Sequence, residues 1–252
     1  MRKKVRRTKK LNLVSSSIRD QIEIERDSLI KDPNFNVFNR FKIHDLLQKE
    51  AEKHSVAMEF PSGKKRGKYA MIRLTKEGLN SAFRYFTSVY KGELNPELIK
   101  ETASLIEEFN SRGYRTTTAR AQGVMMIYPR PEKIASEIER VCNENNTLEY
   151  PIDKALHSHF HLSRIHPFSD GNGRLARIIQ NGILDTENLP PIILTSEDRR
   201  QYVGLINEAQ VEYKENEGLL KPKQARFFNY LALKLRDSLV QAKNNLRQGK
   251  YK

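Results

Sequence analysis

The sequence contains a single cysteine, Cys142, in 252 residues. One thiol excludes an internal disulfide and a cysteine metal cluster, and it is typical of a reducing compartment. No apolar run approaches the ~20 residues of a transmembrane helix, no secretory leader is visible, and no internal repeat occurs. We therefore expect a cytoplasmic globular protein without a membrane contact, long enough for one large domain or two smaller ones.

Acidic residues are outnumbered, since 45 Lys and Arg stand against 31 Asp and Glu, for a formal net charge of +14. Such a charge attracts polyanions, including nucleic acids and nucleotides. Part of it belongs to the N-terminus, MRKKVRRTKK, in which seven of ten residues are Lys or Arg. This arm is either solvated or a nucleic-acid contact, and the sequence leaves both open.

The spacing of apolar residues and turn formers predicts a mainly α-helical chain in three parts, 1–91, 92–215 and 216–252. The first part is a small α+β region. In it we expect helices over 15–31, 41–54 and 75–91, and a β-hairpin over 56–75 around the basic turn PSGKKRGK. In the second of these helices the apolar stripe consists of Ile43, Leu46, Leu47 and Ala51. The hairpin and its flanking helices loosely resemble a winged-helix module, which predicts a second nucleic-acid contact.

The rest of the chain is predicted to be helical, over 96–109, 131–144, 151–165, 172–185, 196–210 and 222–246. Between the first two helices lies an extended or hairpin segment, GYRTTTARAQGVMMIYPRP. Two helices have clear core stripes, namely Ile152, Ala155, Leu156, His159, Leu162 and Ile165 before the break at 166–171, and Leu175, Ile178, Ile179 and Ile183 after it.

The stretch HPFSDGNGRLAR, residues 166–177, interrupts these two buried helices. A helix N-terminus carries free N–H groups and partial positive charge, which bind anions, and the glycines on both sides of Asn172 let an anion approach the backbone. Arg174 and Arg177, three residues apart, are predicted to project from one face and grip phosphate oxygens. Asp170 would repel a bare anion, but it suits Mg²⁺ bridged to phosphate. With His166 as a general base, the stretch predicts transfer of a phosphorus-bearing group.

The same twelve residues match the signature of Fic-domain proteins, H-P-F-x-D/E-G-N-G-R-x-x-R, at every specified position. The resemblance covers roughly residues 92–215 and implies a Fic-fold helical bundle with a β-hairpin flap. It implies a protein adenylyltransferase, which moves AMP from ATP to a Ser, Thr or Tyr hydroxyl and releases pyrophosphate. The flap, residues 114–128, would dock the target protein by backbone pairing.

The resemblance also implies roles for single residues. His166 would deprotonate the target hydroxyl and Asp170 would hold Mg²⁺. The α- and β-phosphates would lie on Gly171, Asn172 and Gly173, with Arg174 on the β-phosphate and Arg177 on the γ-phosphate. Phe168 would anchor the loop, and Tyr202 would lie near the nucleotide base. Gly173 stands where Doc-type kinases have lysine, which favours AMP transfer over phosphate transfer.

Many Fic proteins inhibit themselves through a helix with the pattern S/T-x-x-x-E-G/N, and no complete copy is found. TSVYKG (87–92) has Lys91 in the place of the glutamate, VEYKEN (211–216) offers Glu215 but starts with Val211, and the copy from Ser104 to Glu108 is followed by Phe109. The chain is then either uninhibited, controlled by a regulatory partner or a second copy of itself, or inhibited through a diverged helix, for which Glu215 is the first choice.

Alternatives remain beside the adenylyltransferase. The chain could be a Fic-fold enzyme with another nucleotide donor, or a non-catalytic nucleotide-binding regulator that contacts nucleic acid through its basic N-terminal region. In HSHFH, His157 and His161 lie four residues apart, as metal ligands on a helix do, but a third ligand is not evident and a core or surface role is favoured.

Overall fold

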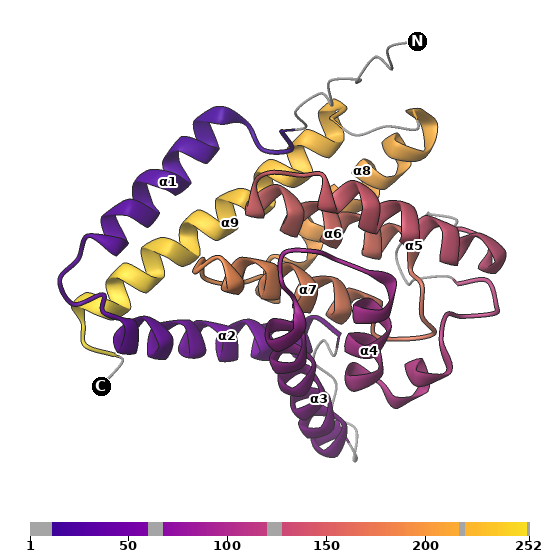
Figure 1. Ribbon diagram of the computed structural model, residues 1–252, viewed down its shortest axis with the longest axis horizontal. Coiled ribbons are helices and arrows are strands. Elements are labelled where there is room, and N and C mark those ends of the chain that lie inside the picture. Colours follow the sequence, from indigo (N-terminus) through magenta and orange to yellow (C-terminus); the bar gives the residue numbers. More distant parts are fainter. Residues whose placement is uncertain (1–11, 60–67, 120–127, 217–219, 251–252) are drawn as a thin grey trace, which may run out of the picture.

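The computed structural model describes residues 12–59, 68–119, 128–216 and 220–250, and these ranges are predominantly helical (Figure 1). The helices in the described part are α1 (Ser16–Ile30), α2 (Val37–Glu59), α3 (Lys68–Val89), α4 (Pro96–Ile106), the 3-10 helix η1 (Glu108–Arg112), α5 (Pro131–Asn146), α6 (Pro151–Ile165), α7 (Asn172–Thr186), α8 (Arg199–Asn216) and α9 (Pro222–Arg247). The mainly α prediction is confirmed for these residues.

Proline marks the start of four helices, at Pro96, Pro131, Pro151 and Pro222. The fixed φ of proline suits the first helical turn, where its missing N–H is not needed. Before Pro96, the side chain of Asn95 accepts a hydrogen bond from the N–H of Leu98 at 2.8 Å, which caps α4. These local signals explain why the predicted starts of α4, α5, α6 and α9 agree with the structure.

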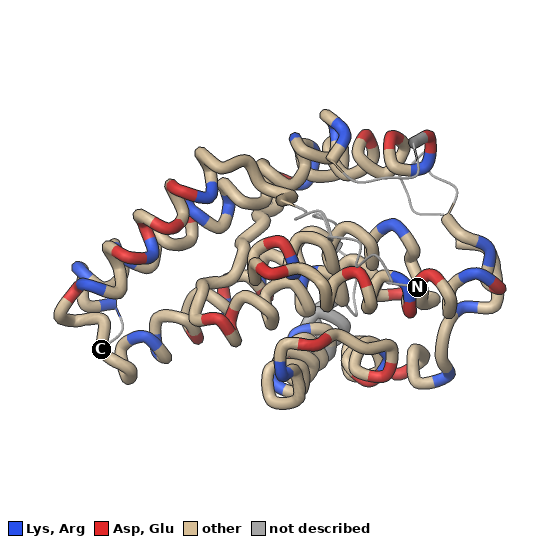
Figure 2. Tube along the Cα trace, turned by 45° about the horizontal axis from the view of Figure 1, so that its top comes forward, with Lys and Arg blue, Asp and Glu red and all other residues tan. Residues whose placement is uncertain are grey.

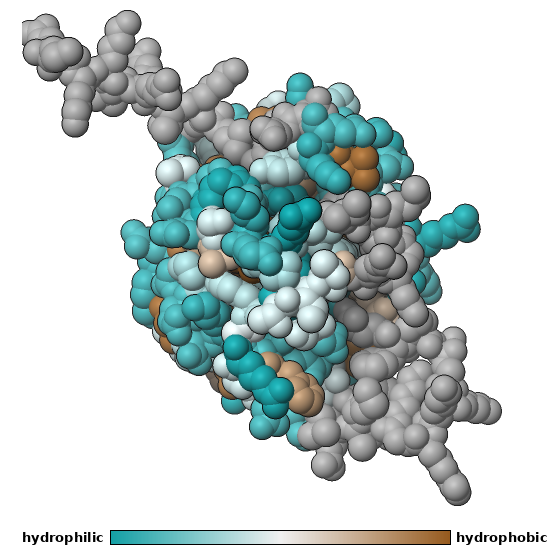
Figure 3. All heavy atoms as spheres, turned by 90° about the vertical axis from the view of Figure 1, so that its right-hand side faces the viewer, coloured by the Kyte–Doolittle hydropathy of each residue, from teal (hydrophilic) through white to brown (hydrophobic). Residues whose placement is uncertain are grey.

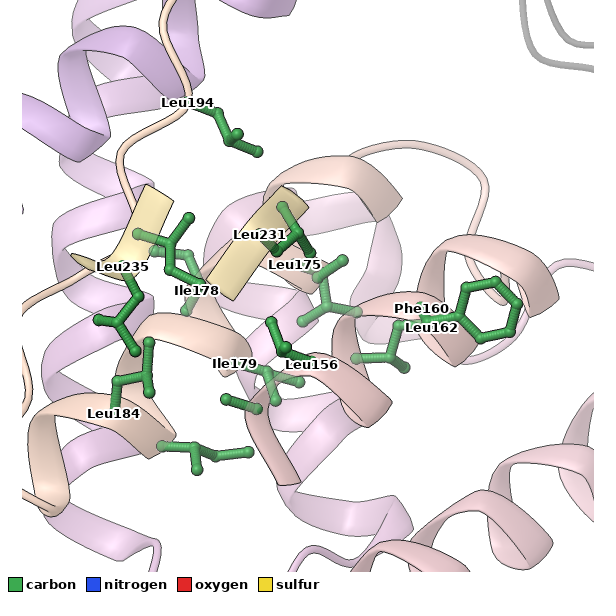
Figure 4. Close-up of a cluster of buried hydrophobic side chains, with 14 of the residues drawn as sticks. Leu156, Phe160, Leu162, Leu175, Ile178, Ile179, Leu184, Leu194, Leu231 and Leu235 are labelled. Carbon is green, nitrogen blue, oxygen red and sulfur yellow. The ribbon is translucent and has the colours of Figure 1, made fainter. Parts of the chain in front are cut away.

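The centre of the molecule is the pair α6 and α7, which pack against each other along their length. Both predicted core stripes are buried, and Figure 4 shows Leu156 and Leu162 of α6 facing the cluster that includes Leu175 and Ile179 of α7. α6 is buried on nearly all sides, including the polar side chains on it. The interruption at 166–171 therefore connects the two central helices.

The other helices cover this pair. α1 and α8 pack along α9, α2 contacts α3 and α9, and α3 packs against α4 and α7 (Figure 1). Gly182 of α7 permits the close approach of α3, because a Cβ atom at this position would lie 2.3 Å from the ring of Phe86. One cluster of buried apolar residues runs through all three predicted parts of the chain. The division near residues 92 and 216 stays a prediction.

The predicted N-terminal hairpin over 56–75 is wrong in the described part. Residues 56–59 complete α2 and residues 68–75 begin α3, while 60–67 lie outside the described residues. Val56 and Met58 imitate the alternation of a strand, but they continue a helical stripe of buried residues, Ile43, Leu47, Ala51, Ser55 and Met58, at steps of three or four. The described residues of the N-terminal region are therefore not α+β, and they do not contain the strands on which the winged-helix resemblance was based.

Two smaller expectations also change. Leu46, which was assigned to the stripe of α2, is 37% exposed. In the flap, residues 114–119 and 128–130 form no strand, and residues 120–127 lie outside the described part, so a β-hairpin is not seen there. The described backbone on both sides of the flap is instead fixed by side chains, as shown below.

Acidic and basic residues are interspersed along the described helices, as the tube in Figure 2 shows. The face drawn in Figure 3 is largely hydrophilic, with few hydrophobic residues between the polar ones. Among the described helices, none combines the length and apolarity needed to span a bilayer. The basic arm 1–10 and the turn 61–67 lie outside the described residues, so their predicted contact with nucleic acid stays a prediction.

Candidate functional site

His166 ends α6 in a left-handed conformation, with φ 52° and ψ 58°. A side chain in this region costs about 1–2 kcal/mol, so the surrounding contacts must hold it there. Its N–H donates to the carbonyl of Leu162 at 3.0 Å, which closes the helix and turns the chain sharply. The turn directs the chain from α6 into the loop that precedes α7.

The loop between the helices is anchored by Phe168 and Asn172. Phe168 is fully buried and packs against Tyr114 with ring centroids 5.4 Å apart, as expected of an anchor. The side-chain amide of Asn172 accepts from the N–H of Phe168 at 2.9 Å and donates to its carbonyl at 2.8 Å. Asn172 therefore uses its side chain to close the loop, and only its backbone is left to offer a phosphate.

Gly171 is the residue before α7 and has a φ of 75°. Its N–H donates to Oδ1 of Asp170 at 2.6 Å. Gly173 lies within the first turn of α7 and is not among the described residues with positive φ. Of the two glycines, Gly171, and not Gly173, is thus required by the backbone conformation.

Arg174 is almost fully buried and lies between two carboxylates. Its Nη1 donates to Glu107 at 2.5 Å and its Nη2 lies 3.2 Å from Oδ2 of Asp170. Its Nε is buried without a hydrogen-bond partner among the described residues. Asp170 keeps 74% of its side chain exposed. Carboxylate oxygens are the ligands that Mg²⁺ prefers, and a guanidinium with an unused donor suits a phosphate, so the residues present fit a metal-bound nucleotide.

Arg177 contacts a different part of the molecule from Arg174. Its Nε donates to Oγ of Ser55 at 2.8 Å, in the C-terminal part of α2. The protein partners of the two arginines are Glu107, between α4 and η1, for Arg174 and Ser55, on α2, for Arg177. Both arginines remain within the first two turns of α7.

A cavity of about 180 Å³ opens beside Arg177. It is lined by residues from several elements, namely Met58, Tyr128, Ser163, His166, Gly173, Arg177, Arg199, Tyr202, Val203, Ile206, Asn207 and Gln210. Four of the predicted site residues, His166, Gly173, Arg177 and Tyr202, thus share one cavity. The other four, Asp170, Gly171, Asn172 and Arg174, lie on the adjoining loop and first turn of α7 and do not line it.

Tyr202 is joined to the buried face of α6. Its hydroxyl and Nε2 of His159 lie 2.9 Å apart. Burial, together with the nearby charge of Arg177, lowers the pKa of His159 to about 3, so its imidazole is neutral at physiological pH. The hydrogen bond fixes the ring of Tyr202 in the wall of the cavity.

Sequence reasoning missed several residues of the site. The ring of Tyr128 stacks on His166, with centroids 4.4 Å apart and planes 26° apart, and burial raises the pKa of Tyr128 to about 12. Arg115 and Glu107 approach the motif from distant positions in the chain, and no local pattern marks them. Ser55 did carry a signal, since Ser55-x-x-x-Glu59 has the spacing of the inhibitory pattern, but residues 56–59 of this pattern lie in the segment that was predicted to be a hairpin.

A second candidate metal centre consists of Glu144, His157 and His161, whose ligand atoms all lie within 4.8 Å of one another. The hydrogen bonds oppose a metal. Nδ1 of His161 accepts from Nε of Arg164 at 3.2 Å, and Nδ1 of His157 lies 3.4 Å from the amide nitrogen of Asn145. Because each Nδ1 faces a hydrogen-bond donor, it acts as an acceptor, and the ring proton of the neutral imidazole is then on Nε2. The Nε2 atoms therefore do not offer the lone pair that a metal needs.

The chain was then compared with known proteins. The family model described as Fic/DOC family matches residues 93–184, which include α4 to most of α7. The protein adenylyltransferase Fic of Nematostella vectensis is 35% identical over 100 residues, which make up 38% of this chain. The aligned part is 22% of that relative, so the chain spans only about a fifth of its length.

Solved structures resemble the chain over most of its length. A Fic domain-containing signaling protein from Bacteroides thetaiotaomicron aligns with a TM-score of 0.74 at 22% identity and covers 92% of this chain and 98% of that one. IbpAFic2, in a structure covalently tethered to Cdc42, aligns with a TM-score of 0.54 at 18% identity, over 88% and 70% of the two chains. Residues 93–184 thus carry a Fic/DOC family domain, and the described helices have the fold of Fic proteins.

Proposed function

We propose that the protein transfers AMP from ATP to a hydroxyl group of a target protein and releases pyrophosphate. The observation that carries the proposal is the shared cavity, where His166, Gly173, Arg177 and Tyr202 meet at the start of α7. The similarity to proteins named adenylyltransferase, over the segment that holds the motif, supports the same reaction.

The reaction needs a base and stabilised phosphates. The His166 imidazole takes the proton of the target hydroxyl while the hydroxyl oxygen bonds to the α-phosphorus. The bond from the α-phosphorus to the oxygen that bridges it to the β-phosphorus then breaks. The stack with Tyr128 holds the imidazole in place for this step. Gly171, Asn172 and Gly173 cradle the α- and β-phosphates at the start of α7, where the N–H groups of Asn172 and Gly173 orient them.

Two arginines stabilise the negative charge of the nucleotide. Arg174 binds the β-phosphate and Arg177 the γ-phosphate, so both act on the leaving pyrophosphate. Asp170 would hold Mg²⁺, which when bound neutralises phosphate charge. Tyr202, with His159 behind it, borders the space for the nucleotide base.

The target protein docks at residues 114–128, beside His166. The tethering of IbpAFic2 to Cdc42 is a property of that pair, and it supports a protein as the acceptor here. The hydroxyl acceptor is Ser, Thr or Tyr. A different nucleotide donor on the same site is the second candidate, because the phosphate contacts do not depend on the base.

The test uses purified protein, Mg²⁺, a cell lysate, and ATP labelled on either the α- or the γ-phosphate. Label from the α position, lost in His166→Ala, is the expected result. Label from the γ position would make the protein a kinase and would contradict the assignment of Gly173. If neither the parent nor Glu59→Gly, a variant that tests for self-inhibition, transfers either label although ATP binds, AMP transfer is rejected. Repeating the assay with α-labelled GTP, CTP and UTP then separates another donor from a nucleotide-binding regulator.

A further inference from the structure

Arg115 has five hydrogen bonds to the backbone around His166 and around the flap. Its N–H donates to the carbonyl of Pro167 at 2.9 Å. Its guanidinium donates to four carbonyl groups, those of His166 and Thr117 at 2.7 Å, Pro129 at 2.7 Å and Ile165 at 3.4 Å. The residue is only 4% exposed.

Such a buried guanidinium is costly, and burial lowers the pKa of Arg115. Each hydrogen bond found for its side chain goes to a carbonyl oxygen and none to a carboxylate. A lysine would carry the same charge with three donors on one atom, and it could not reach these carbonyls in several directions at once. The site therefore requires the forked shape of arginine as well as a cation.

The acceptors of Arg115 lie in two separate places in the chain. Thr117 and Pro129 lie on either side of residues 120–127, and the carbonyls of Ile165 and His166 lie at the end of α6. Tyr128 adds a second connection, because it precedes Pro129 and its ring stacks on His166. One side chain thus holds both described ends of the flap against the residue proposed as the base.

We infer that Arg115 is a positioning residue for the target protein, which holds Thr117 and Pro129, at the described ends of the flap, in place beside His166. The inference rests on the proposed function, since the proposed function docks the target at the flap. Arg115 acts by bringing the hydroxyl of the target protein to His166. The residues proposed to bind the phosphates lie on α7 and the loop before it, and the hydrogen bonds found for Arg115 go to other residues.

The first experiment is hydrogen exchange of the full-length protein, which does not depend on activity. In Arg115→Lys the amides of residues 114–119 and those of Tyr128 and Arg130 should exchange at least tenfold faster than in the parent, while those of α7 keep their rates. The matched control is Arg112→Lys, an exposed arginine three residues earlier. Equal exchange in the parent and in Arg115→Lys would overturn the inference, whatever the activity of the protein.

The second experiment separates target transfer from nucleotide turnover. With α-labelled ATP and a cell lysate, Arg115→Lys should lose at least tenfold more label transfer to protein than it loses in hydrolysis of ATP to AMP without lysate. Equal losses would show that Arg115 acts on His166 alone and would overturn the inference. In Arg115→Ala, added methylguanidine should restore transfer but methylammonium should not. If the parent and Glu59→Gly both transfer no AMP, the proposed function is rejected, whereas the exchange result still shows whether Arg115 holds the described ends of the flap.

Discussion

Nε of Arg177 donates to the hydroxyl of Ser55 at 2.8 Å, and this contact joins α7 to the C-terminal part of α2. Ser55 begins the pattern Ser55-x-x-x-Glu59, which is followed by Phe60 where the inhibitory pattern of Fic proteins has Gly or Asn. The side chain of Glu59 lies outside the described part. The pattern makes Glu59 a second candidate, beside Glu215, for the glutamate of a diverged inhibitory helix.

Replacing Glu59 with glycine should raise AMP transfer severalfold. A carboxylate next to Arg177 would compete with the γ-phosphate for the guanidinium, and glycine removes this competition. The measurement is the initial rate of label transfer from α-labelled ATP. Glu215→Gly is the matched control, because Glu215 is exposed at the end of α8 and does not line the cavity. Activation by Glu215→Gly without activation by Glu59→Gly would return the inhibitory role to α8.

Replacing Gly182 with alanine should destabilise the protein by about 1–3 kcal/mol, as overpacking of a core does. The new methyl group would lie 2.3 Å from the ring of Phe86, and α3 would have to move away from α7. The measurement is the free energy of unfolding in urea.

Gly204→Ala is the opposite case on α8. A Cβ atom there meets nothing within 4 Å, so alanine should stabilise the helix by up to about 1 kcal/mol. Equal effects of the two substitutions would show that helix propensity, and not the contact with Phe86, controls the stability at Gly182.

The unfolding free energy should decrease as the pH falls from 6.5 to 5. The pKa of His159 is lowered to about 3 in the folded protein, and burial also lowers the pKa of His157 and His161. Their unfolded pKa is near 6.5, so between these values the unfolded chain binds more protons, and stability rises with pH. Each such proton contributes at most about 1.4 kcal/mol per pH unit.

The variant His159→Gln tests this assignment. Its unfolding free energy should depend less steeply on pH between 6.5 and 5 than that of the parent, a window above the usual pKa of carboxylic acids. His54→Gln, which changes a half-exposed ring on α2, is the control. A slope that is the same in the parent and in His159→Gln would exclude His159 as a source of the acid sensitivity.

Local patterns in the sequence predicted the centre of the fold. The stripes of α6 and α7, the proline starts and the turn at 166–171 all depend on residues near one another in the chain, so their spacing is sufficient. The same reasoning failed at Val56 and Met58, because a short apolar run looks alike in a strand and at the end of a helix. The helical stripe that begins at Ile43 settles the question only when it is followed through Ser55.

The sequence predicted the motif but not the residues that surround it. Arg115, Tyr128 and Ser55 reach His166 or Arg177 across 38 to 122 positions, and such contacts depend on how the helices pack. The spacing of Arg174 and Arg177 on α7 could be predicted, but Glu107 and Ser55, which bind them, come from segments whose positions are set by the tertiary fold.

The left-handed backbone at residue 166 has a consequence for the stability of the protein. Glycine adopts this conformation without cost and asparagine more easily than most residues, whereas histidine must be held there by its neighbours. Neither replacement offers a base. Glycine or asparagine at this position would therefore relieve the backbone but remove the proposed base, so a gain in stability there would come with a loss of the proposed chemistry.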